Sequence, residues 1–219
     1  MNKNLLILGA GQYGTVVKEI AEEMGCFDKI DFLDDSYGTD NPNYHEEAIG
    51  TIKDMASFSG DYFYAIPAIG IAESRLALIQ KIKEETTFQI PVIVSPRAYI
   101  SKSAQLQKGT VIEPLAGVHA NTVIGIASYV SMGAVVNHNA VVLEGCHIDN
   151  NAVVMSGALV VAKTYIDPCT VVRRAAKKYT IGQDGHITEE SMGSFPQYDK
   201  DAEWVQQYIK ENGHEPTFF

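Results

Sequence analysis

Three histidines lie in the middle of the chain: His119, His138 and His147. Histidine is the side chain that exchanges protons most readily near neutral pH. His138 stands in the segment VVNHNAVV, two residues after a valine of the repeat described below, which predicts an outward position at a turn. There it can act as a general base, an effect worth roughly 10²–10⁴ in rate. The alternative is a surface histidine without a role.

A glycine-rich segment near the N-terminus, GAGQYG over residues 9–14, is the second group that suggests chemistry. It follows a short apolar run and precedes a helical pattern that Gly25 ends. Glycines between a strand and a helix allow backbone N–H groups to approach a phosphate. Asp34 and Asp35 follow about twenty residues later, where dinucleotide-binding folds place an acid on a ribose. The alternative is a domain that only packs against the rest of the chain and positions it.

An aliphatic residue occupies every sixth position from Ile100 to Val172, and a small residue follows four positions after nearly all of them. This period fits neither the 3.6 residues of a helical turn nor a hairpin meander. It predicts a coil of short strands in which each group of six residues forms one flat face. Three faces make one turn of a triangular prism, so the run predicts about four turns.

Residues 18 positions apart stack on neighbouring turns of such a prism. Ser156 is therefore expected over His138, and Gly157 over Asn139. His147 follows His138 by nine residues, which is half a turn. These two histidines can therefore meet only across a contact between two prisms.

The first hundred residues predict a small parallel α/β sheet. Strand-like segments, KIDFLDD, DYFYAIPAIG and FQIPVIV, alternate with helical patterns such as IAESRLALIQKIKEE. Pro91 and Pro96 mark the passage into the prism, so we place the boundary near residue 95. The predicted organisation is a Rossmann-like domain over 1–95, a prism over 96–176 and a C-terminal extension over 177–219.

The C-terminal extension is acidic, and Asp201 is placed to cap a short helix through AEWVQQYIKEN. An open prism end exposes unpaired backbone groups that need a cover. We therefore expect the extension to act as a cap or as a subunit contact.

The glycine-turn domain joined to a hexapeptide prism resembles the bacterial sugar acyltransferases. These include the nucleotide-sugar N-acetyltransferases of the bacillosamine and perosamine pathways and the sialic acid O-acetyltransferases. The resemblance covers the chain to about residue 175. It implies a left-handed parallel β-helix that forms a homotrimer around an axis parallel to the prism.

The same resemblance implies acetyl-CoA as the acyl donor and a nucleotide-linked sugar as the acceptor. His138 matches the family's Asn/Asp-His-Asp/Asn segment, which holds the catalytic base. The residues expected at acetyl-CoA are His147, Ser156, Gly157, Arg173, Arg174 and Lys177. The residues expected at the nucleotide are Gly9, Gly11, Tyr13, Gly14, Asp34 and Asp35.

The chain departs from the family pattern at two positions. Tyr13 stands where the family usually has histidine, which puts the nucleotide contacts in question. Asn139 stands where the family often has an aspartate that orients the catalytic histidine. Glu144 or a backbone carbonyl is an alternative partner for the His138 ring. His119 is expected to be a ladder residue near the site.

Composition narrows the remaining choices. A net charge of −10 gives no electrostatic support to nucleic-acid binding. The three cysteines have no CxxC spacing, which predicts structural roles and no metal site. No apolar run approaches the roughly 18–20 residues of a membrane span. We therefore expect a cytoplasmic protein that does not bind a membrane.

Three functional classes remain in view. The first is an acetyl-CoA-dependent acetyltransferase acting on a sugar amine or hydroxyl in surface-glycan synthesis. The second is a metal enzyme of the γ-carbonic anhydrase kind, which also uses trimeric prisms but places two histidine ligands five residues apart. The histidine spacings here are 19 and 9 residues, which do not fit. The third is a non-catalytic protein that binds nucleotide sugars.

Overall fold

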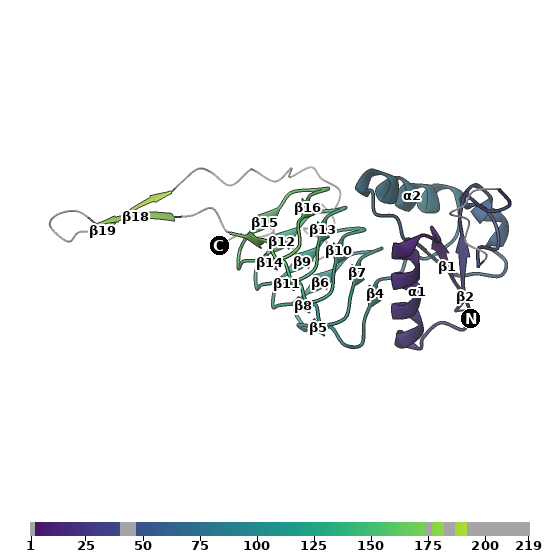
Figure 1. The fold of residues 1–219 in the computed structure, drawn as a ribbon, viewed down its shortest axis with the longest axis horizontal. Helices are drawn as coiled ribbons and strands as arrows, with labels where there is room; N and C mark the ends of the chain where they lie inside the picture. Colours follow the sequence, from purple (N-terminus) through teal and green to yellow (C-terminus); the bar gives the residue numbers. More distant parts are fainter. Residues whose placement is uncertain (1–2, 40–46, 174–176, 182–186, 192–219) are drawn as a thin grey trace.

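The computed structural model describes residues 3–39, 47–173, 177–181 and 187–191. It shows a small α/β domain followed by a parallel β-helix of about four turns (Figure 1). The predicted fold class is confirmed in these two parts. The short helix expected after Asp201 lies outside the described residues.

The N-terminal domain is a three-stranded parallel sheet in the order β2-β1-β3. Its strands are β1 (Leu5–Leu8), β2 (Ile30–Leu33) and β3 (Tyr64–Pro67). Helix α1 (Gln12–Met24) follows β1, a 3-10 helix η1 (Ile52–Phe58) precedes β3, and α2 (Ala72–Glu85) follows it. Every residue of β1 is buried, as expected for a central strand covered on both faces. Helix α1 ends at Gly25, which adopts the left-handed conformation with φ 61°.

The segment FQIPVIV does not form one last strand of this sheet. Gln89 makes a single bridge to Tyr64 in the N-terminal sheet, whereas β4 (Ile93–Val94) pairs with β7 (Val111–Ile112) in the prism. Pro91 separates the two pairings, because proline has no N–H to donate to a ladder. The chain therefore passes between the two sheets within a few residues.

The prism has three faces, and each face is a sheet of parallel strands. Face 1 contains β4, β7 (Val111–Ile112), β10 (Tyr129–Val130), β13 (His147–Ile148) and β16 (Tyr165–Ile166). Face 2 contains β5 (Tyr99–Ile100), β8 (Gly117–Val118), β11 (Val135–Val136), β14 (Val153–Val154) and β17 (Val171–Val172). Face 3 contains β6 (Gln105–Leu106), β9 (Val123–Ile124), β12 (Val141–Val142) and β15 (Leu159–Val160).

The second residue of each prism strand points inward and forms the core. Stacked residues are 18 positions apart, as in Val130 and Ile148. The inward series and the small residues near the corners form one buried cluster that includes Ile124, Val136 and Cys146. The six-residue period therefore identified the core correctly.

The corners of the prism follow the same period. Every sixth residue from Gly109 to Cys169 has a positive φ, between 54° and 74°. Glycine and asparagine adopt this left-handed conformation most easily, and they occupy most of the corners. Leu115, Ala127, Lys163 and Cys169 adopt it without that advantage.

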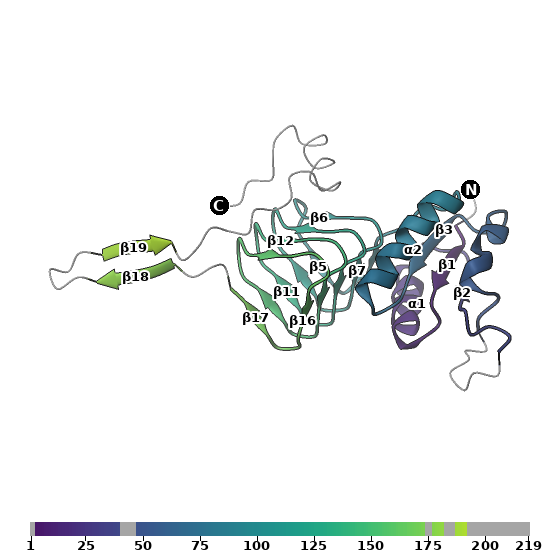
Figure 2. The same ribbon diagram turned by 90° about the horizontal axis from the view of Figure 1, so that it is seen from above.

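The N-terminal domain packs against face 1. The outward residues Ile93, Val111 and Tyr129 are completely buried there. Helix α1 contacts β4, and Figure 1 shows α1 between the small sheet and the prism. Beyond the last coil, β18 (Lys177–Ile181) and β19 (Ile187–Ser191) form an antiparallel hairpin that extends away from the prism (Figure 2).

Candidate active site

The glycines of the turn between β1 and α1 have different surroundings. Gly9 has a φ of 112°, which a residue with a side chain rarely adopts. A Cβ atom on Gly14 would lie 2.2 Å from the carbonyl oxygen of Gly9. A Cβ atom on Gly11 would have no neighbour within 4 Å. Gly9 and Gly14 therefore allow the turn to form, while Gly11 leaves open space beside the helix N-terminus.

The two acids after β2 both bind backbone groups of their own domain. Asp34 accepts a hydrogen bond from the Ala10 N–H at 2.8 Å and another from the Ser36 N–H at 2.9 Å. Asp35 accepts one from the Ile52 N–H at 3.0 Å. Asp34 thus fastens the glycine turn to the end of β2. The expected contact of either acid with a nucleoside stays a prediction.

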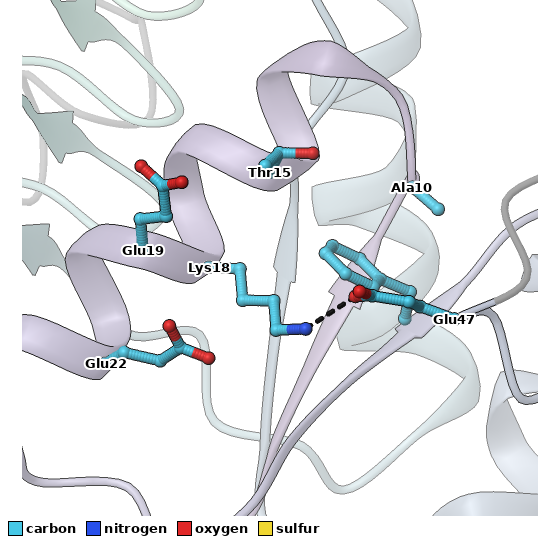
Figure 3. A pocket seen from close by; sticks show the side chains of 7 residues that line it. Ala10, Thr15, Lys18, Glu19, Glu22 and Glu47 are labelled. Atoms are coloured by element: carbon cyan, nitrogen blue, oxygen red, sulfur yellow. Dashed lines mark hydrogen bonds and ion pairs between the residues drawn. The ribbon is translucent and has the colours of Figure 1, made fainter.

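A hollow of about 290 Å³ opens beside the glycine turn, along one side of α1 (Figure 3). It is lined by Ala10, Thr15, Lys18, Glu19, Glu22, Phe32 and Glu47. The Lys18 ammonium lies 2.5 Å from the Glu47 carboxylate and 5.4 Å from the centre of the Phe32 ring. The hydrogen bond to Glu47 raises the pKa of Lys18. The hollow therefore carries one cation among three acids.

Tyr13 does not face this hollow. Its ring stacks on the Tyr129 ring of face 1, with centroids 4.3 Å apart and an interplanar angle of 21°. Burial raises the pKa of Tyr13, and the nearby Tyr129 and Glu113 raise it further. The stack on the prism occupies the Tyr13 ring, and the expected contact of Tyr13 with a nucleotide stays a prediction.

His147 lies next to this stack on face 1. Its Nε2 atom is 2.9 Å from the Ser131 hydroxyl, and its ring meets the edges of the Tyr13 and Tyr165 rings. Burial lowers the pKa of His147, an effect that the charge of Asp149 opposes. The neutral imidazole is therefore favoured, in which one ring nitrogen donates and the other accepts a hydrogen bond.

Glu113 and Ser131 belong to the same group, although the sequence did not single them out. Glu113 is 8 % exposed and accepts a hydrogen bond from the Met132 N–H at 3.0 Å. Burial raises the pKa of Glu113, while hydrogen bonds from Ser131 and Met132 oppose that shift. Ser131 precedes His147 by 16 residues, two short of a full coil, and that spacing is the signal that would have paired them.

His138 lies on the opposite side of the prism. It is exposed at the corner between β11 of face 2 and β12 of face 3. In a triangular prism that corner is opposite face 1, which carries the glycine turn and His147. A single chain therefore keeps His138 apart from the glycine turn and from His147, while Ser156 and Gly157 lie on the next coil beside it.

Asn139 adopts the left-handed conformation at this corner, with a φ of 59°. Its Oδ1 atom accepts a hydrogen bond from the Asn121 amide at 3.3 Å. Glu144 lies near the next corner, one face further along the chain. Among the described residues, none donates a hydrogen bond to the His138 ring or accepts one from it.

The coil above His138 is arranged as the spacing predicted, with one difference. The Gly157 N–H donates to the His138 carbonyl at 3.1 Å, so the ladder already uses it. Ser156 is half-buried beside it. The expected contact of Gly157 with acetyl-CoA stays a prediction, and among the described residues the Ser156 N–H has no backbone partner.

The other predicted residues are more remote. His119 meets the edge of the Tyr99 ring on face 2, with centroids 5.8 Å apart. Arg173 is exposed after the last prism strand. Arg174 and the side chain of Lys177 lie outside what the structure describes. The described part of the chain holds no group of three metal-ligating side chains and no helix able to cross a membrane.

Comparisons with known proteins agree with this architecture. Residues 4–82 match the PglD N-terminal domain family. A search among curated proteins gives no match. The acetyltransferase domain of PglB from Neisseria gonorrhoeae, solved with acetyl coenzyme A, is 28 % identical, with a TM-score of 0.72 over 80 % of this chain and 83 % of that one.

Two more distant structures share the fold. PerB from Caulobacter crescentus, solved with CoA and GDP-perosamine, is 20 % identical, with a TM-score of 0.65 over 84 % of this chain and 97 % of that one. WeeI from Acinetobacter baumannii is 18 % identical, with a TM-score of 0.50 over 84 % of this chain and 99 % of that one. The match to the PglD N-terminal domain family and the similarity to the PglB domain confirm the resemblance to hexapeptide-repeat sugar acyltransferases.

Proposed function

We propose that this chain, whose two parts fit the hexapeptide-repeat sugar N-acetyltransferases, transfers an acetyl group from acetyl-CoA to a nucleotide-linked amino sugar. The observation that carries the proposal is the joint match of both parts. The glycine-turn domain matches one family, and an acetyltransferase domain that binds acetyl coenzyme A matches 80 % of the chain. Neither part alone would select a sugar acceptor and an acetyl donor together.

The proposed active site lies between two copies of the chain. His138 is on the corner opposite face 1, which carries His147 and against which Tyr13 of α1 packs. A donor and an acceptor can therefore meet all of these residues only where the His138 corner of one copy approaches face 1 of another. A closed ring of three copies supplies one such contact for each copy.

Face 2 is the surface that we expect between the copies. Its outward positions are apolar or small on every coil: Tyr99, Gly117, Val135, Val153 and Val171. Tyr99 is 62 % exposed and Val171 is 44 % exposed in the single chain. An apolar stripe of this kind favours association. His138 borders the stripe, so association along face 2 would cover it.

The proposed reaction is a direct transfer. The sugar amine attacks the thioester carbonyl carbon and forms the C–N bond, while His138 takes a proton from the amine. The Ser156 N–H supports the negative oxygen of the tetrahedral intermediate. The C–S bond then breaks, and the proton passes from His138 to the departing sulfur of coenzyme A. The products are an N-acetylated sugar and free coenzyme A.

The His138→Ala variant tests the base. We expect kcat to fall by about two orders of magnitude or more, while acetyl-CoA binding measured by calorimetry persists. His138→Asn, which keeps a polar side chain but is not basic, should be nearly as slow. His119→Ala is the matched control and should keep most of the activity. If His138→Ala retains most of its turnover, the assignment is wrong and His147 becomes the next candidate.

Mixing two impaired variants, assayed with the acceptor well below its KM, tests the shared site. His138→Ala lacks the base, and Gly11→Val obstructs the acceptor side. After joint refolding in equal amounts, random mixed trimers should regain roughly a quarter of the wild-type activity, because that share of sites receives both intact halves. A site within one chain predicts no recovery.

Mass spectrometry of the product, with hydroxylamine to cleave esters, distinguishes transfer to nitrogen from transfer to oxygen.

A further inference from the structure

Arg75, in the first turn of α2, is completely buried. A buried arginine is usually paired with a carboxylate, because removing its charge from water is costly. Arg75 instead donates all its described hydrogen bonds to backbone carbonyl oxygens, and no ion pair to it is found among the described residues. Backbone carbonyls from three chain segments therefore hold the guanidinium in place of a carboxylate.

The guanidinium connects the two parts of the chain. Its Nη1 atom donates to the carbonyls of Ile69 at 2.8 Å and Gly70 at 2.9 Å, in the loop after β3. Its Nε atom donates to the Ala127 carbonyl at 2.6 Å, and Nη2 donates to the Gly145 carbonyl at 2.8 Å. Ala127 and Gly145 are equivalent corners of two successive coils. One planar fork thus joins the N-terminal domain to two coils at once.

The same side chain also supports the aromatic stack at the junction. The guanidinium lies over the Tyr129 ring, 4.0 Å from its centroid. The Tyr129 hydroxyl donates to the Pro67 carbonyl at the end of β3, at 2.9 Å. Tyr13, in the first turn of α1, stacks on the same Tyr129 ring. Arg75 is therefore coupled to the helix that follows the glycine turn.

Helix α2 lies along a row of small corner residues. A Cβ atom on Gly109 would be 2.8 Å from Ile79, and one on Gly145 would be 2.9 Å from Leu76. The next corner, Lys163, is 3.8 Å from the Glu73 carboxylate. Successive side chains of α2 thus meet successive coils, which fixes the height of the helix along the prism.

We infer that Arg75 is a positioning residue that sets the height and orientation of the glycine-turn domain relative to the coil of His138. This inference rests on the proposed function, because the domain would present the acceptor to the reacting groups. A misplacement of about 1 Å far from the chemistry can cost about 10²-fold in rate. Lysine cannot replace the arginine, since its three donors share one nitrogen, whereas Nε, Nη1 and Nη2 reach four separate carbonyls.

The test compares Arg75→Lys and Arg75→Met with the control Arg97→Met. Arg97 also joins the prism to the N-terminal domain, through Glu23 at 2.6 Å, but its side chain is 60 % exposed. Hydrogen–deuterium exchange should become at least about tenfold faster in peptides covering α2 and the loop after β3 in both Arg75 variants. The Arg97 variant should match the wild type.

Kinetics then separate positioning from general damage. We expect kcat/KM for the nucleotide-linked acceptor to fall at least about tenfold in Arg75→Lys, while acetyl-CoA affinity stays within about twofold. Turnover of a free amino sugar at high concentration, which does not need the domain, should be unchanged. An equal loss with both acceptors would indicate a merely structural role and overturn the inference.

The exchange measurement is independent of activity. Unchanged exchange in Arg75→Lys overturns the inference even if the wild type is an active transferase. Faster exchange in a protein without transferase activity leaves the junction as described and removes the proposed function. If Arg75→Met does not fold, Arg75→Lys alone decides, because it keeps the charge and much of the volume.

Discussion

Gly11 and Gly14 lie three residues apart in one turn, but only Gly14 is surrounded by atoms. Its Cα approaches the Gly9 carbonyl so closely that a methyl group would overlap it at 2.2 Å. Gly11 has an extended backbone, with φ −70° and ψ −173°, and free space around it. The glycine pattern in the sequence therefore combines a packing requirement with an opening toward solvent.

Substitution separates these two roles. Gly14→Ala should lower the free energy of unfolding by about 2–3 kcal/mol, because the added methyl group forces the helix away from the strand. Gly11→Val should change the free energy of unfolding by less than about 1 kcal/mol, since valine readily adopts an extended backbone conformation. Urea unfolding followed by circular dichroism measures both.

Acceptor kinetics supply the second half of this comparison. The folded Gly11→Val variant should raise the acceptor KM about tenfold or more and leave the acetyl-CoA KM unchanged, because it obstructs backbone N–H groups at the helix N-terminus. An unchanged acceptor KM would leave the domain with a purely structural role.

For single residues, the sequence predicted the position in the repeat better than the hydrogen-bond and stacking partners. Spacing correctly placed Ser156 in the coil above His138, with the Gly157 N–H bonded to the His138 carbonyl. It did not show that the ladder uses that N–H, nor that Tyr13 turns toward the prism. Those outcomes depend on contacts between segments far apart in the chain, which a local pattern does not contain.

Among the elements, the corner is the repeated unit with the most specific conformation. Each corner needs one residue with positive φ, and the cost for a residue other than glycine is about 1–2 kcal/mol. Asn139 meets this need beside His138, which gives a physical reason for asparagine there. Glycine and asparagine at six-residue intervals were visible in the sequence and could have predicted the corners.

Cys169 offers a test of the corner rule, because it is exposed and has a φ of 58°. Cys169→Asn should raise the free energy of unfolding by about 0.5–1 kcal/mol by relieving this conformation. Cys26→Asn is the matched control, since Cys26 is also exposed but has no positive φ, and it should change stability by less than about 0.5 kcal/mol. A shift of the urea midpoint in both variants, or in neither, would contradict the rule.

For the whole molecule, the main expectation is assembly through face 2. Val153→Lys places a charge in the middle of the outward apolar stripe and should convert a trimer into monomers with unchanged circular dichroism. Activity should be lost together with the trimer. Gln105→Lys, on the outward side of face 3, is the control and should remain trimeric. Sedimentation velocity measures both, and a wild type that sediments as a monomer would refute the assembly.

The sequence predicted the two folds but not how they dock. The six-residue period and the glycine turn each belong to one continuous segment. The docking depends on Arg75, a single arginine in an ordinary amphipathic helix, whose partners lie 52 and 70 residues further along the chain. Its burial follows from packing against corners that are small, and no local pattern marks it.

The left-handed corners recur every six residues, so the direction of a corner side chain depends on the number of prism residues that precede it. Removing six residues upstream of His138 would carry it one third of a turn around the prism, to a corner beside the N-terminal domain. Removing 18 residues between β4 and His138 would restore its direction but bring it one coil closer to the first strand of the prism. An upstream insertion or deletion of six residues therefore rotates His138 about the prism axis, and one of 18 residues shifts it along the axis by one coil. Length changes after the His138 coil, in contrast, leave its direction and its height unaltered.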